Sequence, residues 1–270
     1  MKSEYISPLN EEIGSVGDIT ESIAIQISQR GFCYFQFGIV TILVFLGAIH
    51  EIYAGIYGEN FIMKLTQVFD VSRENSIPTV FSIFNLLLSS ALLFGIYLHR
   101  RARSDSWAVY WLALSVLFLL LSIDEGASIH ERASGLRLAD TMESFGVFLA
   151  FCHVQFLDVL CGRSWVIYGL LFSVAVLIVF IPFLRHIDRR SASLFCVAGA
   201  LFVSGAVGLE YIEAFLRGSG SSEGRYQMDI VQILEESLEM YGIALFNSTL
   251  FVRIVPKSMT VISRGRASIH

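Results

Sequence analysis

Acidic residues and histidines gather at four places where long apolar segments end or begin. These places read GAIHEIYAG, LLLSIDEGASIHERAS, GAVGLEYIEAF and VQILEESLEMYG. Oxygen-rich sites that include one or two imidazoles suit Mg, Mn, Fe or Zn. The pattern therefore predicts a divalent-metal site. The nine carboxylates and two histidines are Glu51, Asp124, Glu125, Glu131, Glu210, Glu213, Glu235, Glu236, Glu239, His50 and His130.

The cost of placing acids in apolar segments indicates that they face a common interior. An acidic residue at the centre of a membrane helix costs about 2.5–3.5 kcal/mol, whereas each Leu, Ile or Phe returns about 0.3–0.6 kcal/mol. Glu235, Glu236 and Glu239 would therefore cancel most of the apolar gain of one span if they faced lipid. Crowded carboxylates also repel one another, so protons, bound cations or a cationic ligand must compensate them.

Helical periodicity selects the residues that we expect to face inward. At about 100° per residue, Asp124 and Glu131 lie about 20° apart on one stripe of a helix. Glu235 and Glu239 are separated by four residues and therefore share a face. The predicted metal ligands are His50, Asp124, Glu131, Glu210, Glu235 and Glu239.

A metal held in this way suggests hydrolytic or acyl-transfer chemistry. The ion would activate water or polarise a phosphoryl or acyl oxygen, with Glu125 or His130 as the candidate general base. His130 lies about 100° from Glu131 around a helix, so it joins the site only if the helix end bends or unwinds. The HExxH zinc motif is absent, because Ala54 and Ser134 stand where its second histidine would be.

The composition identifies the kind of element that must position these residues. The chain has 270 residues, of which 54% are hydrophobic and 16% charged, and its mean hydropathy is +0.64. Soluble domains average about 45–50% apolar and about 25% charged residues. The predicted fold is therefore an all-α polytopic transmembrane bundle. There is no basic face for nucleic acid, and no CxxC pair for a disulfide or thiolate site.

Stretches without Lys or Arg predict six membrane spans, since a helix needs roughly 20 apolar residues to cross a bilayer. Six spans put twelve Lys and Arg on one side and seven on the other, which places both termini in the cytoplasm. Segment 142–160 is then interfacial or re-entrant, and seven spans, with this segment crossing, remain the alternative. The expected spans are about 32–54, 78–98, 107–130, 165–184, 191–215 and 229–252.

Three regions follow from these spans. Residues 1–30 form a polar cytoplasmic segment, residues 31–254 the transmembrane domain, and residues 255–270 a cytoplasmic tail. In the first outer loop, Ser76 is expected to cap the second span. Arg73 just before it is either part of a solvated loop or part of a lid over the acidic residues.

Several of these motifs occur together in a known group of proteins. FDVSRENSIPTVFS, LLLSIDEGASIHER, GAVGLE and LEESLEMYGIALF resemble the REN-x-x-PT, LDE-x-x-SIHE and EE-x-x-EM-x-G motifs of uncharacterised bacterial multipass membrane proteins. The resemblance covers about residues 68–250. It implies a bacterial inner (plasma) membrane protein with six spans, and it implies no activity.

Three functions are compatible with the sequence. The first is binding of a divalent metal near the outer face of the membrane, with chemistry on a lipid or lipid-linked substrate. The second is proton- or cation-coupled transport, since intramembrane carboxylates also form proton relays. The third is a non-catalytic subunit of a membrane complex. The expected partners are the lipid bilayer and a lipid or cationic ligand, with no nucleic acid.

Overall fold

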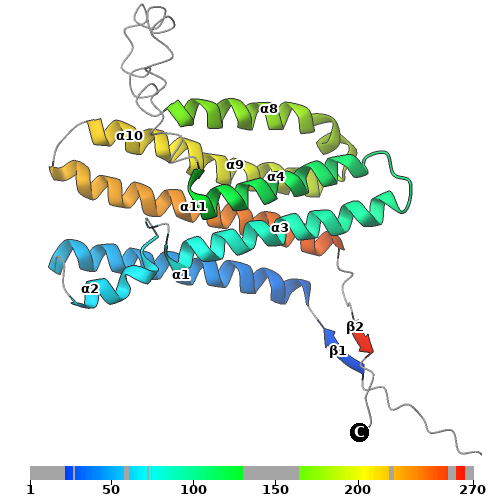
Figure 1. The fold of residues 1–270 in the computed structure, drawn as a ribbon, viewed down its shortest axis with the longest axis horizontal. Helices are drawn as coiled ribbons and strands as arrows, with labels where there is room; N and C mark the ends of the chain where they lie inside the picture. Colours follow the sequence, from blue (N-terminus) through cyan, green and yellow to red (C-terminus); the bar gives the residue numbers. More distant parts are fainter. Residues whose placement is uncertain are drawn as a thin grey trace, which may run out of the picture.

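The computed structural model describes residues 22–26, 28–57, 61–71, 73, 75–129, 164–218, 222–254 and 260–264. These residues form a bundle of helices (Figure 1). The helices are α1 (Gln29–Tyr57), α2 (Phe61–Thr66), η1 (Gln67–Phe69), α3 (Ile77–Arg101), α4 (Ala108–Ala127), α8 (Ser164–His186), α9 (Arg189–Val203), η3 (Ser204–Leu209), α10 (Glu210–Gly218) and α11 (Ser222–Ile254).

In the part of the chain that the structure describes, five helical stretches are long and apolar enough to cross a membrane, and they match the first five expected spans. They are Gln29–Ala54, Ile77–Arg101, Ala108–Ala127, Tyr168–His186 and Arg189–Glu213. The sixth expected span, 229–252, lies within α11, a helix of 33 residues that is not among these five. Segment 142–160 lies outside the described residues. The predicted helical class is thus confirmed, with five helices long and apolar enough to cross a membrane.

Helix α11 occupies the middle of the bundle. It packs against α1, α3, α9 and η3, while α4 packs against α3 and α8 lies at the periphery beside α9 (Figure 1). Helices α1, α4 and α9 run in one direction, and α3, α8 and α11 run in the other. In particular, α4 ends and α8 begins at the same end of the bundle.

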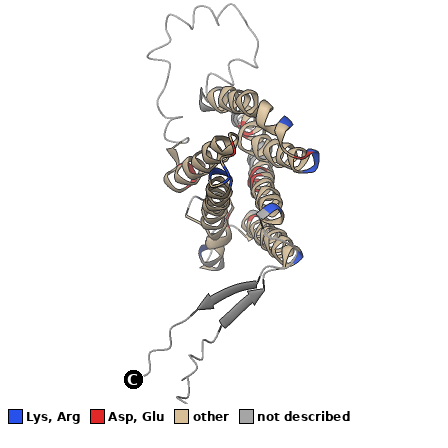
Figure 2. Ribbon diagram, turned by 90° about the vertical axis from the view of Figure 1, so that its right-hand side faces the viewer, with Lys and Arg blue, Asp and Glu red and all other residues tan. Residues whose placement is uncertain are grey.

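One end of the bundle, which we call the basic end, gathers arginines. Figure 2 views the molecule from this end, and Lys and Arg lie at the helix ends nearest the viewer. Arg253 of α11 pairs with Asp188, and the rings of Trp107 and His186 stack 4.3 Å apart. The described arginines at this end are Arg30, Arg100, Arg101, Arg103, Arg185, Arg189, Arg190 and Arg253.

The core between the helices contains hydrogen-bonded polar side chains as well as apolar ones. Asn247 of α11 donates to the backbone carbonyl of Asn85 over 3.0 Å and accepts from Ser89 over 2.7 Å. Ser90 and Ser115 exchange hydrogen bonds between α3 and α4. Because lipid offers no partners to polar groups, buried amides and hydroxyls hold membrane helices together by bonding one another.

Two glycines allow α11 to approach its neighbours closely. A Cβ atom at Gly242 would lie 2.9 Å from the Ala198 carbonyl oxygen. A Cβ atom at Gly205 would lie 2.7 Å from the Glu235 carbonyl oxygen. Gly205 belongs to η3, a π-helical stretch of six residues between α9 and α10. Such stretches are rare and occur frequently at functional sites.

Two features were not expected from the sequence. Strands β1 (Ser22–Gln26) and β2 (Thr260–Arg264) pair antiparallel and bring the two ends of the chain together. The loop between α1 and α3 contains α2 and η1, which pack against α1. The expected cap of the second span is confirmed, since the Ser76 side chain accepts a hydrogen bond from the backbone N–H of Thr79.

Candidate metal centre

The end of the bundle opposite the arginines, which we call the acidic end, brings the chemistry-bearing residues together. Helices α1 and α4 end there, α3 and α11 begin there, and the η1 segment lies beside α1 (Figure 1). Among the described residues, two groups of side chains could each hold a metal ion, because their ligand atoms lie within 4.8 Å of one another. The groups are His50, Glu51 and Asp70, and Glu210, Glu213 and Glu235.

The first group surrounds a buried histidine. The His50 side chain is 1% exposed, and its Nδ1 lies 2.9 Å from the Thr66 hydroxyl. Its Nε2 lies 3.7 Å from Asp70 Oδ2, beyond hydrogen-bond distance, and has no hydrogen-bond partner. Glu51 shares a hydrogen bond with Asp70. A buried ring nitrogen therefore points towards a pair of adjacent carboxylates.

These distances are compatible with a bound cation. Zinc lies about 2.0–2.1 Å from imidazole nitrogen and about 2.0–2.2 Å from carboxylate oxygen. Two ligand atoms of one ion are therefore at most about 4 Å apart, and the 3.7 Å between His50 and Asp70 lies within this limit. The hydrogen bond at Nδ1 fixes the ring orientation, as second-shell partners do for metal-bound histidines.

The second group lies where the π-helical stretch meets α11. Glu210 and Glu213 are in the first turn of α10, directly after η3, and Glu235 is on α11. The Glu213 side chain is buried, and one of its oxygens accepts a hydrogen bond from Gln232 over 3.1 Å. Because Gly205 has no side chain, η3 lies directly against the α11 backbone at Glu235. This contact brings the α10 carboxylates to α11.

Further carboxylates connect the two groups with α4 and α11. Glu239 lies within electrostatic reach of Asp124 and Glu125 of α4. Glu51 lies within reach of Asp229 at the start of α11. We call the whole set the acidic basin: His50, Glu51, Asp70, Asp124, Glu125, Glu210, Glu213, Asp229, Glu235, Glu236 and Glu239.

The expected ligands thus lie in two places. Glu210 and Glu235 are together in one group, whereas His50 is in the other group with Glu51 and Asp70. Asp124, Glu125 and Glu239 lie near one another. Helix α4 ends at Ala127, and Ser128 after it has φ 49°, which is a left-handed conformation. The expected ligand Glu131 and the expected base His130 lie outside the described residues, as does Glu74.

Sequence reasoning did not propose Asp70 as a ligand. Asp70 lies in a loop between spans, where an acidic residue is ordinary. Its burial, with 6% of the residue exposed, follows from the packing of η1 against α1. Gly47 contributes to this packing, because its missing side chain leaves room for Val71. Only the fold reveals the pairing of Asp70 with His50.

Arg73 borders the first group. Its Nε lies 3.2 Å from Asp70 Oδ2, and its Nη1 lies 3.4 Å from the Gln67 side-chain oxygen. The Arg73 side chain is about half exposed. The pairing therefore joins a half-exposed cation to a buried carboxylate of the same loop.

The comparison with protein families covers most of the chain. The family model of a domain of unknown function (DUF8692) matches residues 37–254. This range runs from within α1 to the end of α11 and contains every residue of the acidic basin. No curated protein and no solved structure matches the chain significantly.

Proposed function

The chain belongs to the DUF8692 family, and we propose that it is a multipass membrane protein that binds divalent metal in the acidic basin. The bound metal would serve chemistry on a lipid or lipid-linked substrate. The observation that carries the metal proposal is the buried His50 Nε2, which lacks a hydrogen-bond partner and lies beside Asp70 and Glu51. An unsatisfied buried nitrogen is costly unless a ligand completes its coordination.

The excess of negative charge in the acidic basin also favours a cation. The described basic residues at this end are Lys64, Arg73, Arg217 and Arg225, and they are fewer than the ten carboxylates. Ten carboxylates cannot all be ionised at close range without compensating charge. Divalent ions supply that charge and bind carboxylate and imidazole ligands directly.

The arrangement of the helix ends supports six spans, with the acidic end facing outward. Six spans require α4 to end and α8 to begin on the same side, and both lie at the acidic end (Figure 1). The arginines at the opposite end agree with a cytoplasmic location, because positive loops stay in the cytoplasm. The bacterial inner membrane is the corresponding location that we propose.

One residue of the acidic basin, Glu125, is suited to a position next to a metal-activated water. Glu125 neighbours Asp124 at the end of α4, and both lie within electrostatic reach of Glu239. We assign Glu125 the role of general base, with His130 as the alternative base. A metal bound in the acidic basin would polarise a phosphoryl or acyl oxygen of the substrate, or would carry a hydroxide formed from water.

The described core favours this reading over proton transport. Among the residues that the structure describes, every buried carboxylate or histidine is at the acidic end: His50, Asp70 and Glu213. The buried polar groups nearer the basic end, such as Asn85, Asn247 and Ser115, are amides and hydroxyls that bond one another. A relay across the membrane needs titratable groups along its length.

Metal content tests the proposal. Detergent-purified protein should carry stoichiometric divalent metal, measured by inductively coupled plasma mass spectrometry. His50→Ala should lose the metal held by the first group, and the Glu235→Gln/Glu239→Gln double variant should lose the metal of the second group. Asp105→Asn is the matched control, because Asp105 pairs with Arg100 at the basic end, and it should retain all the metal. Metal-free protein after purification with added Mg, Mn, Fe or Zn would overturn the proposal.

A further inference from the structure

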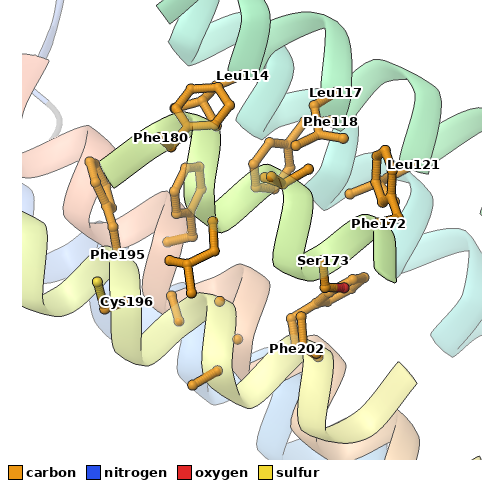
Figure 3. Close-up of a pocket in the computed structure, with 18 of the residues that line it drawn as sticks. Leu114, Leu117, Phe118, Leu121, Phe172, Ser173, Phe180, Phe195, Cys196 and Phe202 are labelled. Carbon is orange, nitrogen blue, oxygen red and sulfur yellow. The ribbon is translucent and has the colours of Figure 1, made fainter. Parts of the chain in front are cut away.

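An apolar cavity lies between α4, α8, α9 and α11. Its volume is about 550 Å³, and Figure 3 shows it as an elongated space between the helices. Side chains such as Leu114, Phe180 and Phe195 line one end, and Leu121, Phe172 and Phe202 line the other. Ligand pockets usually measure about 300–1,000 Å³.

The lining excludes a polar ligand. Nearly all of its side chains are aliphatic or aromatic, and Ser173 donates its hydroxyl hydrogen to the Gly169 carbonyl oxygen over 2.7 Å. An engineered apolar cavity of about 150 Å³ stays dry and binds benzene. A cavity more than three times that size, inside a membrane bundle, is suited to a long hydrocarbon group.

The cavity is reached from the lipid-facing surface. Helix α8 is the least buried of the five candidate spans. In its most apolar stretch of 18 residues, 6% of the residues are buried, whereas the share in the other four spans is 22–39%. Its side chains Leu170 and Leu177 line the cavity and are also at least half exposed. The wall formed by α8 is therefore continuous with the surface that the bilayer covers, and a lipid chain can enter beside it.

One end of the cavity lies next to the acidic basin. Leu121 precedes Asp124 by three residues on α4, and Gly242 follows Glu239 by three residues on α11. Three residues are just under one helical turn, a rise of about 4.5 Å. A hydrocarbon chain in the cavity would therefore place its polar head at the carboxylates.

We propose that the cavity holds one acyl chain of an ethanolamine phospholipid whose head group lies in the acidic basin. This inference rests on the proposed function, since the metal in the basin would bind the lipid phosphate. Charge complementarity selects the head group, because the excess carboxylates favour a positively charged amine. An anionic glycerol head group would add to the negative charge of the basin.

Filling the cavity should prevent lipid binding. A Cβ atom at Gly199 meets no atom within 4 Å, and Gly199 lines the cavity. Gly199→Phe should lose the lipid that wild-type protein retains in native mass spectrometry after incubation with phosphatidylethanolamine. Gly95→Phe is the matched control, because a Cβ there is equally unobstructed and Gly95 is not among the lining residues. Equal retention by Gly199→Phe and Gly95→Phe would overturn the inference.

The same samples separate this inference from the metal proposal. Gly199→Phe should lose lipid and keep metal, since the acidic basin is unchanged. If wild-type protein retains lipid but carries no metal, the metal proposal is overturned, whereas binding of an acyl chain in the cavity is still supported. Phosphatidylglycerol retained as well as phosphatidylethanolamine would overturn the assignment of the head group.

Photocrosslinking tests the inference without any variant. Wild-type protein is reconstituted into vesicles of phosphatidylethanolamine and phosphatidylglycerol that contain a diazirine on the ethanolamine lipid's acyl chain. Adducts mapped by peptide mass spectrometry should include Phe172 and Phe202, which line the end of the cavity nearest the acidic basin. Labelling confined to side chains that do not line the cavity would overturn the inference.

Discussion

His50 illustrates what a residue's type and position reveal before its partners are known. A histidine at the end of an apolar span is a credible metal ligand from sequence alone, and the structure gives it two carboxylate neighbours. Those neighbours are Glu51, the next residue in the chain, and Asp70, which a loop brings back to α1. Contacts formed by loops depend on packing and have no periodic signal in the sequence, so Asp70 could not be identified as a partner in advance.

Gly205 is the residue for which the structure makes the sharpest stability prediction. In Gly205→Ala the new Cβ would lie 2.7 Å from the Glu235 carbonyl oxygen and 2.8 Å from Glu239 Cγ. Because one of these atoms is backbone, η3 must move away from α11. Overpacking of this kind costs about 1–3 kcal/mol. The thermal unfolding midpoint in detergent should therefore fall.

Gly95→Ala is the control for this substitution. A Cβ at Gly95 meets no atom within 4 Å, and alanine is the better helix former. Its unfolding midpoint should stay the same or rise. A Gly205→Ala protein as stable as Gly95→Ala would contradict the close contact between η3 and α11.

At the scale of elements, the positions of the membrane spans were predictable from the sequence. The side of each helix on which a given residue lies, its helical phase, was not. Runs of about 20 apolar residues identify membrane helices almost regardless of their neighbours, which explains the agreement for α1, α3, α4, α8 and α9. The phase argument assumed about 100° per residue throughout. The π-helical turn between Ser204 and Leu209 changes that phase before Glu210 and Glu213. Glu210 and Glu213 shift together, because they are three residues apart on α10 and share a face, and both therefore join Glu235.

The turn between α8 and α9 should respond to acid. The backbone N–H of Ser191 donates to Asp188 over 2.9 Å and, together with Arg253, lowers the pKa of Asp188 below its usual 3.8. The folded state therefore favours the ionised carboxylate. The ionised Asp188 stabilises the folded state fully when the pH is above the usual pKa of 3.8. This stabilisation is lost as the pH falls through the lower pKa that Asp188 has in the folded state.

Comparison with Asp188→Asn measures this effect. Asparagine keeps the helix cap and removes the charge. The wild-type unfolding midpoint should exceed that of the variant at pH 7, and the difference should shrink as the pH falls below 4. A difference that stays constant down to pH 3 would show that the ionised Asp188 does not stabilise the turn.

At the scale of the whole molecule, charge separates the two ends of the bundle. Eight of the described arginines lie at the basic end, and the acidic basin lies at the other end. The sequence predicted this division, because positively charged loops stay in the cytoplasm. How the acidic residues divide between two groups depends on how α1, α10 and α11 pack. Packing of that kind is decided by tertiary contacts such as those of Gly47 and Gly205.

The orientation can be tested by thiol labelling of cells. In a background in which Cys33, Cys152, Cys161 and Cys196 are replaced by serine, Asn75→Cys should react with an impermeant maleimide from outside. Asn75 is exposed next to the start of α3 at the acidic end. Ser106→Cys, exposed at the basic end, should react only after permeabilisation. The reverse pattern would place the acidic basin in the cytoplasm.

The neighbouring positions of the first and last helices affect how the protein is made. Phe32 stacks on Phe251, and Thr41 bonds Tyr241 across 200 residues of chain. At about 5–20 residues per second, a ribosome needs about 10–40 s to synthesise that interval. During this time α1 lacks α11, so the side of α1 that carries Phe32 and Thr41 is uncovered. The contact between α1 and α11 can therefore form only after nearly the whole domain has been synthesised.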